Sequence, residues 1–403
     1  MDMIYLDHAA ATPINPKVLE AMEPYFSRDF FNPSAAYLPA KKVAADYEAA
    51  KATIAHAIGA KSHDLVITAG ATEANNLAFT SLTRAGDVFA GGPPNQRIWG
   101  KANTAGPARS KVLYLATEHD SVRRAAEARG GMSVKVKPTG LIDMDDLKSK
   151  ITDDTELISV ALVNGEIGTI QPLAEFSALL REIKIDRLRR GVKTPLLLHS
   201  DASQALNLLD INVARLGVDL LTLNSAKIYG PKGVGALYVS HEAKLQPTIL
   251  GGGQENGLRS GTENVPGVIG FAKAVELAKT HLSSNRKKYA SLKQLLLKEL
   301  QGYELINKKH SLDNFVNICY NNIDGERLVF LLETKEVYVA TGAACAASKG
   351  EKSHVLRALG LTDSEIAGSL RLTLGDTNTE AQILEAAKII NEVVTQERRR
   401  VNG

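Results

Sequence analysis

A lysine at the end of an apolar run is the first residue whose position favours chemistry. Residues 219–240 read DLLTLNSAKIYGPKGVGALYVS, where residues 220–223 predict a buried strand and residues 230–233 turn the chain into a second strand. Lys227 then lies where the first strand leaves the core. An amine held against apolar walls loses solvation of its charged form, so it becomes a nucleophile that can form a Schiff base. Taken alone, a lysine in this place is more often a solvated surface residue.

A group of small residues with a hydroxyl follows another predicted strand. Residues 65–68 form that strand, and Gly70-Ala71-Thr72-Glu73 opens the next helix. A junction of this kind exposes backbone N–H groups at the positive end of the helix, which suits a phosphate group. The alternative is that Thr72 only caps the helix.

A carboxylate and an imidazole also follow predicted strands. Residues 196–198 lead to Asp201, and residues 112–116 lead to Thr117-Glu118-His119. A carboxylate at the end of a buried strand needs a cationic partner, and a protonated pyridine nitrogen would provide one. The alternatives are that Asp201 caps a helix and that His119 is a structural histidine.

The alternation of strands with helices, each strand ending in a polar cluster, predicts an α/β fold. Its sheet should be mostly parallel, with the ligand beyond the carboxyl ends of the strands. The 403 residues allow two domains, which we place at residues 15–262 and at residues 1–14 with 263–403. Helices are expected at residues 266–282, 286–300 and 380–398, the last with core-packing residues at helical spacing.

Composition excludes several classes of protein. With 44% hydrophobic residues, 23% charged residues and a net charge of +3, the chain is typical of globular proteins, and nucleic acid is not expected as its ligand. The two cysteines, Cys319 and Cys345, exclude a disulfide framework and favour a reducing cytoplasm. No apolar window approaches the length of about 20 residues that a membrane helix needs, and the N-terminus lacks a secretory signal. The Gly-, Pro- and Ala-rich residues 85–110, with Trp99, predict a long irregular loop.

Together these motifs resemble the fold-type I pyridoxal phosphate enzymes and, more closely, the NifS-like cysteine desulfurases, which are relatives of the class V aminotransferases. The resemblance covers nearly the whole chain and implies a seven-stranded, mostly parallel sheet in a large domain plus a smaller α+β domain that carries a cysteine loop. The matching motifs, in chain order, are Tyr5-Leu6-Asp7-His8-Ala9-Ala10, Gly70-Ala71-Thr72-Glu73-Ala74-Asn75-Asn76, Thr117-Glu118-His119, Lys227-Ile228-Tyr229-Gly230-Pro231-Lys232-Gly233, Arg259-Ser260-Gly261-Thr262, Gly342-Ala343-Ala344-Cys345 and Ser369-Leu370-Arg371.

The resemblance implies pyridoxal 5'-phosphate as the cofactor, no metal, and a homodimer. Lys227 would form the Schiff base and later act as a base, while Asp201 would hold the proton of the pyridinium nitrogen. The remaining cofactor contacts would come from His119 on the ring, Gln204 on the phenolic oxygen, Ala71, Thr72 and Ser225 near the phosphate, and Thr262 reaching the phosphate from the other subunit.

The resemblance also implies L-cysteine as the substrate. Arg371 would clamp the substrate carboxylate with its two-pronged guanidinium. Cys345 would attack the substrate sulfur as a thiolate, leaving alanine and a persulfide that passes to a sulfur-acceptor protein. Iron–sulfur scaffold assembly, tRNA thiolation and a dedicated relay protein all fit that acceptor. Without the resemblance Cys345 would be read as a small packing residue, and Cys319 is expected to be structural.

Four features depart from the usual family pattern. Ala226 replaces a histidine, Gly165 an asparagine and Asn224 a serine, and the segment of residues 32–34 lacks its usual trailing histidine, with Tyr37 nearby instead. Each change removes or alters a hydrogen bond to the cofactor, so weaker cofactor retention is expected. The alternative functions are a selenocysteine lyase, a C–S lyase or an aminotransferase of the same fold, or a non-catalytic scaffold derived from it.

Overall fold

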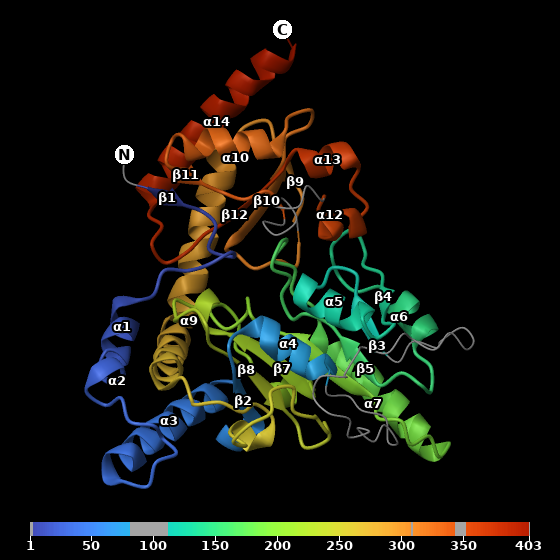
Figure 1. The fold of residues 1–403 in the computed structure, drawn as a ribbon. Coiled ribbons are helices and arrows are strands. Elements are labelled where there is room, and N and C mark those ends of the chain that lie inside the picture. Colours follow the sequence, from blue (N-terminus) through green and yellow to red (C-terminus); the bar gives the residue numbers. More distant parts are fainter. Residues whose placement is uncertain (1–2, 81–111, 308, 343–351, 403) are drawn as a thin grey trace, which may run out of the picture.

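The computed structural model describes residues 3–80, 112–307, 309–342 and 352–402. At its centre is a seven-stranded sheet in the order β2-β8-β7-β6-β5-β3-β4 (Figure 1). All neighbouring strands run parallel except β8, which is antiparallel to β2 and β7. The predicted α/β fold with a mostly parallel sheet is therefore confirmed. The strands are β2 (Leu65–Thr68), β3 (Val112–Leu115), β4 (Met132–Val134), β5 (Leu157–Ser159), β6 (Leu197–Asp201), β7 (Leu220–Asn224) and β8 (Gly235–Val239).

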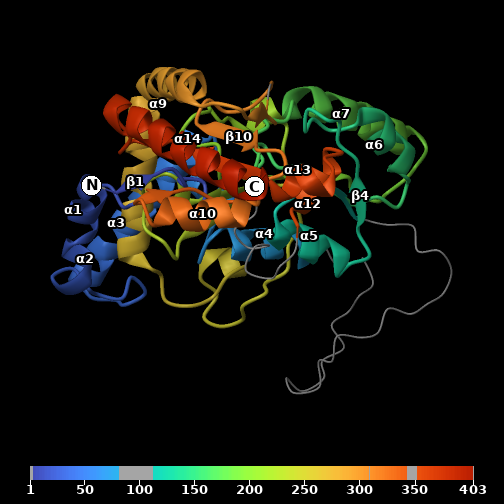
Figure 2. The ribbon, with the colours of Figure 1, turned by 90° about the horizontal axis from the view of Figure 1, so that it is seen from above.

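Alternate residues of these strands pack into two apolar layers on opposite faces of the sheet. Leu220 belongs to the layer under α4 (Ala71–Thr80) and α5 (Asp120–Glu127), whereas Leu221 belongs to the larger layer with α3 (Leu38–Ala57) and α7 (Leu173–Arg189). Figure 2 shows α4 and α5 on the other side of the sheet from α7. A sheet buried on both faces requires nearly continuous apolar strands, which explains the run from residue 220 to 223.

A second group of elements contains both ends of the chain, in the upper part of Figure 1. Its strands form a three-stranded antiparallel sheet and a parallel pair of the first strand with β11. The division into residues 15–262 and residues 1–14 with 263–403 stays a prediction. The elements of this group are β1 (Ile4–Tyr5), β9 (Glu304–Leu305), β10 (Phe315–Cys319), α10 (Gly325–Glu333), β11 (Val337–Tyr338), α12 (His354–Ala358), α13 (Asp363–Ala367), β12 (Ser369–Thr373) and α14 (Glu380–Asn402).

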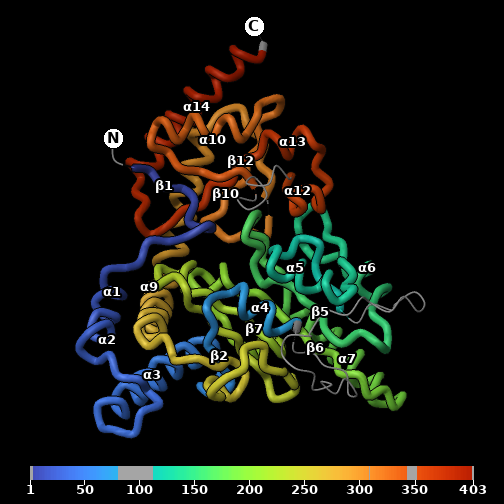
Figure 3. The backbone as a smooth tube through the Cα atoms, viewed as in Figure 1, coloured from blue at the N-terminus to red at the C-terminus, as the bar shows by residue number. Residues whose placement is uncertain are grey.

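The two helices expected after residue 265 are one helix, α9 (Val265–Glu299), so that prediction is wrong. Serine and asparagine at residues 283–285 are weak helix formers, which favoured a break there. Asn285 is instead buried, and its Nδ2 donates to Asn207 Oδ1 at 3.2 Å. This tertiary contact keeps the chain helical, and α9 runs from the lower into the upper group (Figure 3).

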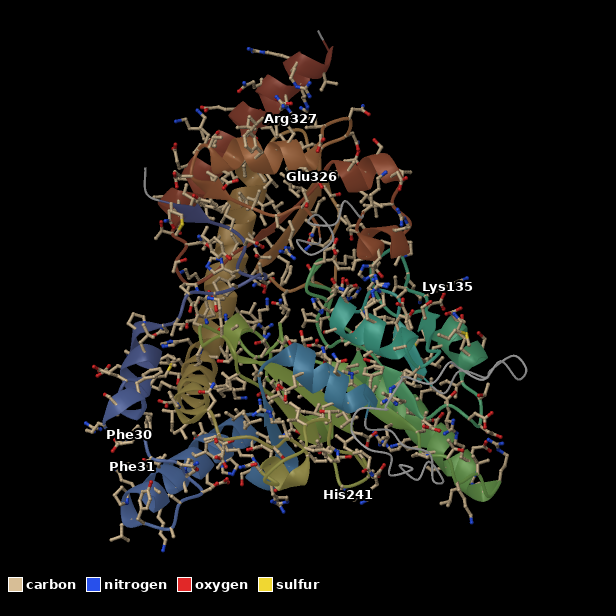
Figure 4. The ribbon with its side chains drawn as sticks, viewed as in Figure 1. Phe30, Phe31, Lys135, His241, Glu326 and Arg327 are labelled. Atoms are coloured by element: carbon tan, nitrogen blue, oxygen red, sulfur yellow. The ribbon has the colours of Figure 1, made fainter. Side chains whose placement is uncertain are left out.

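The remaining helices lie at the edges of the two groups. Figure 4 labels Phe30 and Phe31, whose rings stack at 4.7 Å between α2 and α3, and Arg327, whose Nε lies 2.6 Å from Glu397 Oε2 on α14. In the described residues no helix is long and apolar enough to span a membrane. The predicted loop at residues 85–110 lies outside the described residues. The helices not yet given are α1 (Pro16–Met22), α2 (Pro24–Ser27), α6 (Met144–Lys150) and α8 (Val213–Leu216). The buried residues expected on the last helix, Ile383, Ala386, Ala387, Ile390 and Val394, are confirmed as core.

Candidate active site

A cavity of about 620 Å³ lies where β2 leads into α4 and β7 leads into β8. Since β2 and β7 both pair antiparallel with β8, their carboxyl ends meet at one edge of the sheet. A Cβ on Gly235 would come within 2.8 Å of Gly70 Cα, so the two turns can approach this closely only with glycine. The lining residues are Ala10, Ala11, Ala69, Gly70, Ala71, Thr72, Glu73, Asn76, Asn224, Ala226, Lys227, Lys232 and Gly233.

Lys227 and Gln204 meet at one backbone carbonyl beside this cavity. Lys227 ends the short turn η3 (Ser225–Lys227) after β7, and its Nζ donates to the carbonyls of Ala9, at 2.7 Å, and Ala10, at 2.5 Å. Gln204, which follows β6, donates its Nε2 to the same Ala9 oxygen at 3.0 Å. Two of the residues predicted for the site are therefore brought together by adjacent strands.

Asp201 is the last residue of β6 and is only 8% exposed. Its Oδ1 accepts the backbone N–H of Ser203 at 2.9 Å, and its Oδ2 accepts Nδ2 of Asn75 at 2.8 Å. Because Asp201 pairs in register with Thr222 of β7, it lies one strand from the turn that carries Lys227. Asn75 is a residue that sequence reasoning misses. The available signal is an amide on the apolar face of α4, next to Ala74, where a polar side chain needs a buried partner.

His119 is exposed and caps the start of α5. Its Nδ1 accepts the backbone N–H of Ser121 at 3.1 Å and lies 2.9 Å from Ser121 Oγ. A backbone N–H can only donate, so Nδ1 carries no hydrogen and the neutral ring has its proton on Nε2. Asn75 Nδ2 also donates to Ser121 Oγ, at 2.8 Å, which links His119 to Asp201.

The residues predicted near a phosphate lie in different places. Ala71 and Thr72 line the cavity at the N-terminus of α4, where the first N–H groups are outside the helical ladder. Ser225 is fully buried and does not line the cavity, and within the described part of the chain its Oγ has no hydrogen-bond partner. Thr262 is exposed and is also not a lining residue. The phosphate contacts of all four stay predictions.

Arg371 lies on β12 and is 6% exposed. Its Nη2 donates to Asp7 Oδ1 at 2.6 Å, and its Nη1 donates to the carbonyls of Gly165, at 3.2 Å, and Gly342, at 3.3 Å. Among the described residues nothing accepts from its buried Nε. A planar guanidinium with an open Nε can take a carboxylate from the side. Cys345 lies outside the described residues.

Two buried carboxyl groups near these residues are also missed by sequence reasoning. Burial raises the pKa of Glu118 to about 8, although its Oε1 accepts the Ala161 N–H at 2.6 Å. Burial raises the pKa of Glu166 to about 7, against the opposing effects of the Ser353 hydroxyl, which donates to its Oε1 at 2.5 Å, and of the Arg371 charge. The available signal is that each glutamate stands in a polar cluster after a strand.

Three of the four departures from the family pattern lie in the cavity or near a residue beside it. Asn224 and Ala226 line the cavity, and Asn224 Oδ1 accepts the Ala226 N–H at 3.2 Å. A Cβ on Gly165 would lie 3.5 Å from Gln204 Nε2, an ordinary contact distance, so a side chain would fit there. The expected loss of cofactor hydrogen bonds stays a prediction.

The donor groups of the cavity fit pyridoxal phosphate. Lys227 offers the amine that reacts with an aldehyde, and the free N–H groups of α4 suit a phosphate. Asp201 lies one strand away, with a charge that suits a ring nitrogen. This arrangement at the carboxyl edge of an α/β sheet defines a class of enzyme, those that hold pyridoxal phosphate through a lysine.

Comparison with known proteins identifies the particular family. The model of the family "Aminotransferase class-V" matches residues 4–92 and 98–385. The cysteine desulfurase IscS of Clostridium botulinum is 34% identical over 98% of this chain and 95% of the relative, and the cysteine desulfurase IscS 1 of Archaeoglobus fulgidus is 36% identical over 97% of each. The chain belongs to the class-V aminotransferase family and, within it, to the cysteine desulfurases.

Solved structures agree with this assignment. The NifS-like protein from Rickettsia africae has a TM-score of 0.82 and 28% identity, covering 98% of this chain and 99% of that one. The structure of SspA in complex with cysteine has a TM-score of 0.75 and 30% identity, covering 92% of this chain and 98% of that one. The cofactor of this family is pyridoxal phosphate, in agreement with the donor groups of the cavity.

Proposed function

We propose that this cysteine desulfurase removes sulfur from L-cysteine, releases L-alanine, and carries the sulfur as a persulfide on Cys345. The convergence of Lys227 and Gln204 on the Ala9 carbonyl, beside the N-terminus of α4, is the observation that carries the proposal. The names of the relatives and the SspA structure with bound cysteine support the choice of substrate.

The residues around the cavity would bind different parts of the cofactor. Lys227 would bind it covalently, and Asp201 would hold its ring nitrogen, Gln204 its phenolic oxygen and His119 its ring, while Ala71, Thr72 and Ser225 would hold its phosphate. When bound, pyridoxal phosphate supplies an electron sink for negative charge on the substrate Cα. Lys227 Nζ would also serve as the base that accepts the substrate Cα proton.

Arg371 and Cys345 act on the two ends of the substrate. The open Nε of Arg371, together with Nη2, takes the substrate carboxylate in a side-on pair. The Cys345 thiolate would attack the substrate sulfur to form the persulfide, and the electron pair of the broken C–S bond would stay on the substrate. Protonation of Cβ and return of the Cα proton from Lys227 would then give alanine.

The partners follow from the same proposal. A homodimer would let Thr262, which is exposed in the single chain, reach the phosphate of the other subunit. The persulfide would pass to an acceptor protein, either an iron–sulfur scaffold or a thiolation relay, and we place the enzyme in the cytoplasm.

The deciding experiment incubates the protein with pyridoxal phosphate and L-cysteine and measures alanine, sulfide and the mass of the Cys345 peptide. Cys345→Ser is expected to stop alanine formation, whereas an aminotransferase or an eliminating C–S lyase would continue. Cys319→Ser is the matched control, because Cys319 is buried on β10 and burial raises its pKa to about 11, so it is not a thiolate. A persulfide on Cys319, or full activity of Cys345→Ser, contradicts the proposal.

A further inference from the structure

Asn75 is a fully buried amide whose two N–H hydrogens are both engaged. It lies on α4 with 0% exposure, and its Nδ2 donates to Asp201 Oδ2 and to Ser121 Oγ, each at 2.8 Å. An amide nitrogen has two hydrogens, so both are used on these two partners. One side chain therefore contacts the residue that ends β6 and a residue of the first turn of α5.

The amide of Asn75 is held in an orientation that leaves its oxygen without a hydrogen bond in the described residues. In the described residues no donor reaches Asn75 Oδ1, although that oxygen is buried, and an unpaired buried acceptor is unfavourable. Turning the amide over would place Oδ1 against the Asp201 carboxylate, acceptor against acceptor. The charge of Asp201 thus fixes the amide with both hydrogens directed at Asp201 and Ser121.

The second branch continues from Ser121 to His119. Because Ser121 Oγ accepts from Asn75, its own hydrogen is available for His119 Nδ1 at 2.9 Å. The Ser121 backbone N–H donates to the same nitrogen at 3.1 Å. With two donors on Nδ1, the ring is held with its proton on Nε2.

We propose that Asn75 is a positioning residue of the cofactor site, which with one amide group fixes the Asp201 carboxylate and directs the Ser121 hydroxyl, as a second donor beside the backbone N–H, at His119 Nδ1. The inference rests on the proposed function, because Asp201 and His119 face the cofactor only if that proposal holds. A residue that only packed or capped a helix would not orient both Asp201 and the Ser121 hydroxyl, as Asn75 does here.

The test compares Asn75→Leu, which keeps the volume but removes both donors, with Ser121→Ala, which removes only the branch to His119. Titration of cofactor-free protein with pyridoxal phosphate should show Asn75→Leu binding about 10- to 100-fold more weakly than wild type, the range expected from losing a hydrogen bond to a charged group. Ser121→Ala should bind within about threefold of wild type. In cofactor-free protein with ¹⁵N-labelled histidine, the His119 Nδ1 signal should shift in both variants because the hydroxyl donor is lost or redirected, while the Nε2–H pattern stays because the backbone N–H of residue 121 still donates to Nδ1.

Asn285→Leu is the matched control, since Asn285 is also a buried helical amide that donates through Nδ2, to Asn207. It should lose stability, as Asn75→Leu does, yet bind the cofactor within about twofold of wild type. Wild-type cofactor affinity and wild-type His119 signals in Asn75→Leu would overturn the inference. If Asn75→Leu does not fold, unchanged His119 signals in Ser121→Ala would overturn it. If the wild-type protein does not bind pyridoxal phosphate, the proposed function is wrong. The spectra of cofactor-free protein would still test whether Asn75 positions the Ser121 hydroxyl at His119.

Discussion

The cavity beside Lys227 and the junction around Arg371 are built from different kinds of contact. At the cavity, Lys227 donates to backbone carbonyls; beside it, Gln204 does the same, and Asp201 accepts from a backbone N–H and from the neutral amide of Asn75. The junction, which we define as Asp7, Gly165, Glu166, Gly342, Ser353 and Arg371, instead contains an ion pair and a buried carboxyl group.

This difference has consequences for how each region responds to change. Contacts between a side chain and neutral backbone groups alter little with pH or with an added anion. A buried carboxyl changes its charge near neutral pH, and an ion pair is altered by any further carboxylate that binds the same guanidinium. We therefore expect the cavity to be a fixed holder for the cofactor and the junction to respond to pH and to the substrate.

Lys227→Ala is expected to have the largest effect and to confine it to chemistry. Loss of the amine should lower desulfurase activity by at least about a thousandfold, because the same group binds the cofactor and moves the proton. The unfolding temperature should change little, since Nζ lies beside the cavity, where it donates to the carbonyls of Ala9 and Ala10 and where water can replace it. Activity is measured as alanine formed from L-cysteine, and stability by thermal unfolding.

Lys244→Ala is the control for this change, because Lys244 is an exposed lysine whose Nζ also donates to a backbone carbonyl, that of His241 at 3.2 Å. It should keep full activity. A Lys227→Ala enzyme that retains more than a tenth of wild-type activity would mean that the cavity is not the centre of the chemistry.

Much of the cavity could be predicted from sequence, and the reason is geometric. Lys227, Gln204 and Asp201 each follow a run of apolar residues, and the carboxyl ends of parallel strands share one edge of a sheet. The strand pattern predicted this position for Lys227 and Asp201, whereas the role of Gln204 came from the family resemblance. Asn75 was missed because its role depends on Asp201, which is 126 residues away in the chain.

The junction could be predicted much less well. Arg371 and Asp7 are 364 residues apart, and Glu166 is bonded by Ser353, 187 residues away. The burial that raises the pKa of Glu166 depends on how the second group of elements packs against the large sheet, which no local pattern reports. The same dependence explains the missed continuity of α9, where a buried contact of Asn285 outweighs weak local helix propensity.

The pH dependence of stability is expected to differ between the junction and Glu118, a buried carboxyl group outside both the junction and the cavity lining. Glu118, which follows β3, has its pKa raised from 4.5 to about 8, and Glu166 in the junction from 4.5 to about 7. In each window the folded protein holds a proton that the unfolded chain has lost, so the free energy of unfolding falls as pH rises. The share due to Glu166 should be present below pH 4.5 and lost by about pH 7, whereas that due to Glu118 should continue to fall to about pH 8.

Glu166→Gln and Glu118→Gln test this difference by denaturant unfolding at pH 5, 7 and 8. For Glu166 a pKa rise from 4.5 to about 7, at about 1.36 kcal/mol for each pH unit, sets an upper limit of about 3 kcal/mol on the gain of the variant over wild type. The gain should level off above pH 7 for Glu166→Gln and keep growing to pH 8 for Glu118→Gln. Gains that do not vary with pH would contradict the assignment of raised pKa values to these two carboxyl groups.

Asp7→Asn should have the smallest effect and separates the junction from the rest of the molecule. The ion pair joins side chains that are 7% and 16% exposed, so removing the anion leaves the Arg371 charge poorly compensated and should cost about 1–3 kcal/mol of stability. L-alanine has the same carboxylate as the substrate but no sulfur, so its binding should again compensate the Arg371 charge. It should therefore raise the unfolding temperature of Asp7→Asn more than that of the wild type, and the KM for L-cysteine should fall a few-fold.

Glu255→Gln provides the comparison, because it breaks a buried ion pair with Lys51 at 2.8 Å that lies in the large sheet group and away from Arg371. Its loss of stability should be at least as large, since both side chains are 5% exposed, but L-alanine should not reverse it. Equal stabilisation of both variants by L-alanine would show that the ligand acts on the whole fold. Selective rescue of Asp7→Asn would place the substrate carboxylate on Arg371, where Asp7 now shares the same Nη2 group.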